Sequence, residues 1–193
     1  MTKQVYIIHG WSGSPKNFWL DWLGKELDKR GIKAVLPKMP DTDMPIIKSW
    51  VEHLASIVGR PGEDVYFVGH SIGCQTIFRY LETINSKVGG VICVAGWFNL
   101  PNLETEEEKN IAKKWLETPI DFEKIKSKVK NQIVAIFSDD DPDVPLSDSE
   151  EFKNKLGSKI IVEHGRGHFS DDSNTKELPV VLDELLKMIK VSE

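Results

Sequence analysis

The chain has 193 residues, a length that predicts one domain with a core large enough to fold without stabilising disulfides. Its 25 basic and 30 acidic residues give a net charge of −5, which disfavours binding to nucleic acid or to an anionic membrane. Two cysteines, Cys74 and Cys93, exclude a disulfide framework and a four-cysteine zinc site. No signal peptide is recognised at the N-terminus, and no apolar run reaches the ~20 residues of a membrane span. We therefore expect a cytoplasmic protein.

Short β-branched runs alternate with longer helical patterns along the chain. The predicted strands are Gln4–His9, Lys33–Leu36, Asp64–Val68, Val88–Ala95, Gln132–Phe137 and Lys159–Val162. The predicted helices are Asn17–Lys29, Pro45–Val58, Ile72–Ile84, Ser147–Leu156 and Leu178–Ile189. Because several strands are continuous apolar runs, both faces of the sheet are expected to be covered. The alternation predicts a single α/β domain over residues 1–193, with a doubly wound parallel sheet and helices on both faces.

The alternation stops between residues 97 and 130, where no strand is predicted. This cap-like insertion carries an acidic run, for which we predict an exposed helix face. Its aromatic residues Trp97, Phe98 and Trp115 are candidates for lining a substrate pocket, together with tryptophans near the N-terminus. For each of them a place in the ordinary core is the alternative.

The clearest motif is Gly69-His70-Ser71-Ile72-Gly73, a G-x-S-x-G pattern between a predicted strand and a predicted helix. A serine on such a sharp turn needs glycine two residues before and after it, because larger side chains would clash with the strand and helix backbones. The motif predicts Ser71 as a nucleophile. The N-terminus of the following helix would favour a developing oxyanion.

An oxyanion hole in this arrangement takes one N–H from the residue after the nucleophile and another from a loop after an adjacent strand. Ile72 supplies the first. Trp11, which follows His9-Gly10 at the end of the first strand, is the best candidate for the second. We expect His9 to brace this loop by hydrogen bonding.

A serine nucleophile needs a histidine base and a carboxylate that orients it, in the chain order Ser, acid, His. His168 lies in a glycine-rich loop before the last helix and is the predicted base, whereas His164 is expected to be structural. The acid should follow the fifth strand, where four aspartates crowd one loop: Asp139, Asp140, Asp141 and Asp143.

Two segments partly match metal-binding patterns, but neither predicts a metal site. The acidic loop matches parts of a calcium-binding EF-hand, but Val144 replaces the required glycine. His164 and His168 have the spacing of a helical zinc pair, but Gly165 and Gly167 argue against a helix.

With these residues placed, the chain resembles the α/β-hydrolase superfamily, and more narrowly the small serine hydrolases of the retinoblastoma-binding protein 9 and YdeN type. The resemblance covers nearly the whole chain. It rests on His9-Gly10, Trp19 with Trp22-Leu23, the G-x-S-x-G motif, the Trp115–Ile125 segment, Ser138-x-x-Asp141-Pro142-x-x-Pro145 and Gly167-His168-Phe169.

The resemblance implies a six-stranded parallel sheet in the order 2-1-3-4-5-6 and esterase-like activity without a cofactor. It also implies a triad of Ser71, His168 and Asp141. Asp140 stays open as the alternative acid, since a shift of one residue in the loop could present it instead. The retinoblastoma-binding motif L-x-C-x-E is absent, so nothing supports that partner.

We therefore expect a serine hydrolase that cleaves small acyl esters through an acyl-enzyme. The sequence does not separate this activity from that of an amidase, aminopeptidase or thioesterase, because all share the tetrahedral oxyanion. A catalytically inactive relative that binds protein partners is the alternative from another class. The sequence does not indicate an oligomeric state.

Overall fold

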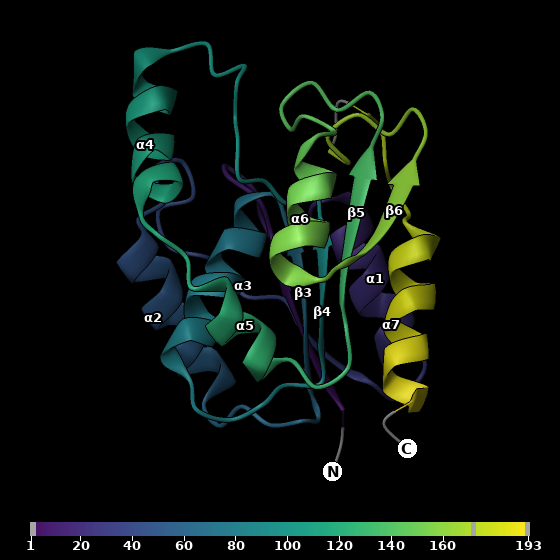
Figure 1. The fold of residues 1–193 in the computed structure, drawn as a ribbon. Coiled ribbons are helices and arrows are strands. Elements are labelled where there is room, and N and C mark those ends of the chain that lie inside the picture. Colours follow the sequence, from purple (N-terminus) through teal and green to yellow (C-terminus); the bar gives the residue numbers. More distant parts are fainter. Residues whose placement is uncertain (1–2, 171–172, 192–193) are drawn as a thin grey trace.

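The structure, a computed structural model, describes residues 3–170 and 173–191. The described residues form one parallel sheet of six strands in the order β2-β1-β3-β4-β5-β6 (Figure 1). The strands are β1 (Gln4–Ile8), β2 (Lys33–Val35), β3 (Val65–His70), β4 (Gly90–Val94), β5 (Ile133–Ser138) and β6 (Lys159–Glu163). The predicted α/β class, the parallel sheet and the strand order are confirmed.

Helices cover both faces of the sheet (Figure 1). They are α1 (Phe18–Asp28), α2 (Ile47–Val58), α3 (Ile72–Thr83), α4 (Glu106–Glu117), α5 (Phe122–Lys128), α6 (Asp148–Leu156) and α7 (Pro179–Val191). Helices α1 and α7 pack on one face, and α2, α3, α5 and α6 pack on the other. The five predicted helices agree with α1, α2, α3, α6 and α7 to within two residues at each end.

Each central strand contributes to two separate apolar clusters, because successive side chains of a strand point to opposite faces. In β1, Val5 and Ile7 face the cluster under α1 and α7, whereas Tyr6 and Ile8 face the other one. This double burial explains why the strands have continuous apolar sequences. Cys74 and Cys93 are both buried and free, as expected for small apolar side chains.

The segment between residues 97 and 130 contains two helices, and α4 stands apart from the sheet near the end where the strand arrows point (Figure 1). Helix α4 begins with a capping box: Thr105 Oγ1 accepts the N–H of Glu108, and Glu108 Oε2 accepts the N–H of Thr105. Helix α5 was not predicted; Asp121 caps it by accepting the N–H of Lys124. The cap role of this segment stays a prediction.

Parallel strands place all their carboxyl ends at one edge of the sheet, where the loops after β1, β3, β4, β5 and β6 meet. The predicted catalytic residues Ser71, Asp141 and His168 follow β3, β5 and β6 at this edge. None of the helices in the described part of the chain has the length and apolar composition that crossing a bilayer would require.

Candidate active site

Ser71 lies between β3 and α3 in a strained backbone conformation. Its φ is 52° and its ψ is −121°, a region that residues other than glycine rarely occupy. The turn is held on both sides. The Ser71 N–H donates to the carbonyl of Val94 at 2.9 Å, and the Ser71 carbonyl accepts the N–H of Cys74 at 3.0 Å. The strand, sharp turn and helix that the motif predicted are present.

The two glycines of the motif are required because other backbone atoms pass close to them. A Cβ on Gly69 would lie 2.7 Å from the backbone N of Cys74, and a Cβ on Gly73 would lie 2.5 Å from the carbonyl oxygen of Ile8. Both contacts are with backbone, which cannot turn away as a flexible side chain could. The motif is therefore a packing requirement as well as a catalytic signature.

The two predicted oxyanion donors lie on either side of the elbow. Ile72 is the first residue of α3, so its N–H has no carbonyl partner within the helix and lies at the positive end of the helix dipole. Trp11 follows β1, and the pairing of Ile8 with Gly69 brings this loop beside β3. Trp11 and Ser71 border the same cavity. The donor role of these two N–H groups stays a prediction.

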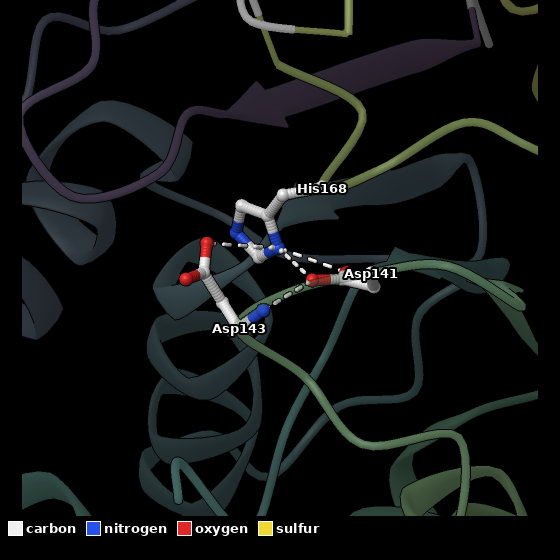
Figure 2. Close-up of side chains that lie close together, drawn as sticks. All are labelled: Asp141, Asp143 and His168. Carbon is white, nitrogen blue, oxygen red and sulfur yellow. Dashed lines mark hydrogen bonds and ion pairs between the residues drawn. The ribbon is translucent and has the colours of Figure 1, made fainter. Parts of the chain in front are cut away.

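The loops after β5 and β6 bring His168 and Asp141 together (Figure 2). The Nδ1 atom of His168 lies 2.9 Å from Oδ2 and 3.1 Å from Oδ1 of Asp141. The Asp141 side chain is only 2% exposed, and its Oδ1 also accepts the backbone N–H groups of Asp143 and Val144 at 2.9 and 3.0 Å. Two contacts thus join the carboxylate to Nδ1 of the imidazole, and two backbone hydrogen bonds hold the carboxylate in place. The other imidazole nitrogen, Nε2, is not engaged by Asp141.

The neighbouring aspartates have other partners. Asp140 accepts the Ser138 hydroxyl at 2.6 Å and the Gly167 N–H at 2.8 Å, and these hydrogen bonds lower the pKa of its carboxyl group. Asp139 contacts Nδ1 of His164 at 2.6 Å, which lowers the pKa of Asp139 and raises that of His164. Both aspartates tie the β5 loop to the β6 loop. The structure therefore brings Asp141, and not Asp140, to His168.

Two further histidines, His70 and His9, form hydrogen bonds to backbone groups near the site. The Nε2–H of His70 donates to the carbonyl of His168 at 2.8 Å, and burial, with a smaller contribution from the nearby His168, lowers the pKa of His70 to about 3. His9 is held between the carbonyl of Gly10, which accepts from its Nδ1, and the N–H of Met39, which donates to its Nε2. Burial lowers the pKa of His9. Both side chains are therefore neutral braces, the role expected for His9.

A cavity of about 670 Å³ opens above the elbow and is bordered by Ser71, His168 and Trp97. Its other walls include residues from the β1 loop, the loop before α2 and the segment around α4: Trp11, Ser12, Asp43, Met44, Leu100, Leu103, Glu107, Glu108 and Ile111.

Of the three predicted pocket aromatics, only Trp97 borders this cavity. The ring of Phe98 packs against that of Phe152, tilted by 30° with ring centroids 4.5 Å apart. Trp115 is 1% exposed and donates its indole N–H to the carbonyl of Pro45.

Several cavity residues were not found from the sequence. Glu107 and Glu108 lie four and three residues before Ile111, so helical spacing could place each of them on the same face of α4 as Ile111. Nothing in the sequence indicated Asp43 and Met44. They reach the cavity because the carbonyl of Asp43 accepts the Trp11 indole N–H at 3.0 Å.

Asp141, Asp143 and His168 also offer atoms that could ligate a metal, since one oxygen or nitrogen of each lies within 4.8 Å of the others. Two of these residues, Asp141 and His168, already form a hydrogen bond with each other through Nδ1 of His168. A metal here would therefore have to break that bond, and the arrangement suits an oriented imidazole better than a metal centre.

The model of the serine hydrolase family matches residues 5–187 of the chain. The hydrolase YdeN of Bacillus subtilis is 36% identical over 189 residues, which cover 96% of this chain and 95% of that protein. The serine hydrolase RBBP9 of Rattus norvegicus is 28% identical over 191 residues, which cover 98% of this chain and 94% of that protein. The similarity therefore extends over nearly the full length of both relatives.

Two solved structures show the same fold. The ydeN gene product of B. subtilis superposes with a TM-score of 0.90 and 33% sequence identity, covering 98% of this chain and 100% of that one. Est1E from Butyrivibrio proteoclasticus has a TM-score of 0.73 at 15% identity, covering 98% of this chain and 89% of that one. At this low identity the second match supports the α/β-hydrolase fold alone.

Proposed function

The chain belongs to the serine hydrolase family and is a hydrolytic enzyme, and we propose that it cleaves small acyl esters through a covalent acyl-enzyme on Ser71. In this proposal His168 is the base and Asp141 orients it. The observation that carries the proposal is the His168–Asp141 hydrogen bond beside the strained Ser71 turn, both on one cavity. A pocket that holds a nucleophile candidate and an oriented base is suited to acyl transfer.

In the first half of the reaction the Ser71 oxygen attacks the ester carbonyl while Nε2 of His168 takes the hydroxyl proton. The N–H groups of Ile72 and Trp11 would stabilise the oxyanion that forms on the carbonyl oxygen. Asp141 keeps the other imidazole nitrogen protonated and stabilises the imidazolium. The imidazolium then gives its proton to the leaving alcohol, and Ser71 is left acylated.

In the second half a water molecule attacks the acyl carbonyl, and His168 takes its proton. The tetrahedral intermediate collapses with cleavage of the bond between the acyl carbon and Ser71 Oγ. His168 protonates that oxygen, and the carboxylic acid leaves. Every proton transfer uses a side chain named above, so the proposed reaction needs no cofactor.

The test is labelling of the purified protein with a fluorophosphonate, followed by mass-spectrometric mapping of the modified residue. We expect the label on Ser71 and none on the Ser71→Ala variant, which should lose on the order of 10⁶ in turnover if the residues act as a unit. Circular dichroism of the variant checks that it is folded. Labelling elsewhere, or a Ser71→Ala variant that keeps more than a few per cent of activity, would overturn the assignment.

A panel of p-nitrophenyl esters, aminoacyl amides and acyl thioesters identifies the reaction class. We expect the esters to be turned over fastest. Faster turnover of the amides or thioesters would move the activity to that class with the same three residues. A protein that neither takes the label nor hydrolyses any member of the panel would favour a binding function instead.

A further inference from the structure

The nucleophile candidate has a hydrogen-bond donor that the triad does not account for. The indole Nε1 of Trp97 lies 3.3 Å from Ser71 Oγ. Trp97 follows β4, its ring is 1% exposed, and it borders the cavity. A distance of 3.3 Å is long for an N–H···O hydrogen bond, but such bonds often tighten only when charge develops in the reaction.

The backbone of Trp97 is held in place by a chain of buried polar groups. Gln75 in α3 donates its Nε2–H to the Trp97 carbonyl at 2.8 Å, and its Oε1 accepts from Arg79 Nη2 at 3.3 Å. Arg79 also donates to the carbonyls of Trp115 and Thr118 at the end of α4, at 2.7 and 3.0 Å. Gln75 and Arg79 are 2% and 5% exposed. The backbone that carries the indole is therefore held by groups on the same helix that begins beside Ser71.

The chemistry of the indole suits a role on this oxygen. Its N–H can only donate, so it uses a lone pair of Ser71 Oγ and does not compete for the hydroxyl proton that His168 must take. Trp97 is 1% exposed, and a buried donor interacts more strongly with a developing negative charge than the same group does in water. The indole therefore favours any step in which charge accumulates on Oγ.

We propose that Trp97 is a catalytic residue whose indole N–H stabilises Ser71 Oγ as it leaves the acyl carbon, so that its main effect is on hydrolysis of the acyl-enzyme. This inference rests on the proposed acyl-enzyme mechanism. In deacylation the electron pair of the breaking C–Oγ bond moves onto Oγ, which is then protonated by His168.

The effect should be larger in deacylation than in acylation because only interactions that strengthen from ground state to transition state accelerate a step. Before acylation the free hydroxyl oxygen is already a good acceptor, so the indole stabilises both the resting state and the transition state. In the acyl-enzyme the same oxygen is the alkyl oxygen of an ester, which is a weak acceptor. The hydrogen bond from the indole therefore strengthens more between the acyl-enzyme and the deacylation transition state than between the free enzyme and the acylation transition state.

The experiment compares wild type with Trp97→Phe, which keeps an aromatic ring and removes the donor. Trp50→Phe is the matched control, because Trp50 is equally buried and its indole N–H donates to the Pro40 carbonyl at 2.7 Å, away from Ser71. Stopped-flow bursts with p-nitrophenyl acetate give the acylation rate. The decay of isolated acyl-enzyme, followed by intact-mass spectrometry, gives the deacylation rate.

For Trp97→Phe we expect deacylation to slow by about 10- to 100-fold and acylation to change by less than about threefold, a loss somewhat below that of an oxyanion-hole donor. Where deacylation limits turnover, kcat and KM should fall together and leave kcat/KM nearly unchanged. Trp50→Phe should match wild type in both steps. A merely structural role for Trp97 would instead slow both steps of Trp97→Phe equally.

Deacylation of Trp97→Phe at the wild-type rate, or equal slowing of both steps, would overturn this inference. Either result leaves the proposed function standing, provided that wild type shows a burst and is labelled on Ser71. Conversely, a wild-type protein without burst or label would overturn the proposed function, and the inference with it.

Discussion

Asp143 donates its backbone N–H to the carboxylate of Asp141 at 2.9 Å, and its own Oδ2 lies 3.8 Å from the His168 nitrogen that Asp141 holds (Figure 2). One imidazole nitrogen thus faces two carboxylates of very different exposure. The Asp141 side chain is 2% exposed and that of Asp143 is 57% exposed. Asp141 is therefore the fixed partner, and Asp143 is a nearby charge that solvent screens.

The first prediction is that Asp143 partly replaces Asp141 when the latter is neutralised. Asp141→Asn should lower kcat by roughly 10²–10⁴, because the amide favours the wrong tautomer of His168. Asp143→Asn alone should change kcat by less than about threefold, as expected for an exposed charge. The double variant should fall at least about tenfold below Asp141→Asn, because no carboxylate then faces Nδ1. The measurement is kcat on one ester at fixed pH.

The control for this series is Asp140→Asn, which should cost about tenfold or less in kcat. It should also lower the melting temperature, because Asp140 holds the Gly167 N–H in the loop that carries His168. If the double variant is no slower than Asp141→Asn, Asp143 contributes nothing. If Asp140→Asn is crippled while Asp141→Asn is nearly normal, the acid must be reassigned to Asp140.

The sequence was most informative where local geometry restricts the residue type. Ser71 could be predicted because the tight turn admits only glycine at positions 69 and 73, and this leaves a pattern in the sequence. The aspartates of the β5 loop were harder to rank. They differ in which loop atoms they reach, and these atoms belong to residues 138 and 163–168, which no local pattern connects to them.

The cavity wall could not be predicted for a similar reason. Trp97 and Trp115 are the same residue type in the same segment and both are buried in the core, yet only Trp97 also borders the cavity. The difference depends on how α4 docks beside α2 and α3, through contacts such as the Trp115 N–H to the Pro45 carbonyl. Helical spacing identifies which residues share a face of α4, but not which face turns toward Ser71.

The second prediction concerns the elbow glycine Gly73. Gly73→Ala should abolish activity and lower the free energy of unfolding by about 1–3 kcal/mol or more, because the new Cβ would lie 2.5 Å from the Ile8 carbonyl oxygen. The control is Gly157→Ala, where φ is +64° but no atom lies within 4 Å. Gly157→Ala should lower the free energy of unfolding by about 1–2 kcal/mol through backbone strain and leave kcat unchanged. Urea unfolding and ester hydrolysis measure the two effects. An active Gly73→Ala enzyme would contradict the packing argument.

The third prediction is a loss of stability in mild acid that depends on His70. Its folded pKa is about 3, below the ordinary value of 6.5, so between these values the unfolded chain binds more protons than the folded one. Stability should therefore fall as pH drops below about 6.5, by at most about 1.4 kcal/mol per pH unit from this group. His70→Gln should remove this contribution and show a smaller change in unfolding free energy between about pH 7.5 and pH 5.

Other titrating groups are common to both proteins and cancel in this comparison. His9, whose pKa is also lowered, adds a slope of the same sign. His164, whose pKa is raised by Asp139, gives stability that is present at low pH and is lost as pH rises through its folded pKa. Equal pH slopes for wild type and His70→Gln, measured by urea unfolding, would show that His70 is not held neutral.

The fourth prediction is a preference for short or compact acyl groups. Each methylene buried on apolar surface contributes about 0.8 kcal/mol, so affinity should rise while the acyl chain meets Leu100, Leu103 and Ile111. The cavity wall is not apolar throughout, because Glu107 and Glu108 border it on the same face of α4 as Ile111. Glu108 already accepts the N–H of Thr105, so the cost falls mainly on Glu107: a longer chain would remove water from its carboxylate, which is costly without a compensating partner.

The measurement is kcat/KM for p-nitrophenyl esters from acetate to palmitate, with Glu107→Gln as the variant and Glu106→Gln as its control. Glu106 lies next to Glu107 in the sequence, but it pairs with Lys109 at 2.8 Å and does not border the cavity. Removing the Glu107 charge should raise the octanoate-to-acetate ratio of kcat/KM by about three- to tenfold, because a neutral amide loses less on desolvation than a carboxylate does. Glu106→Gln should leave the ratio unchanged, since the Glu106 charge lies outside the path of the acyl chain.

A wild-type maximum at laurate or longer would show that the α4 wall does not limit chain length. An equal change in both variants would show that the ratio responds to overall charge and not to the cavity wall.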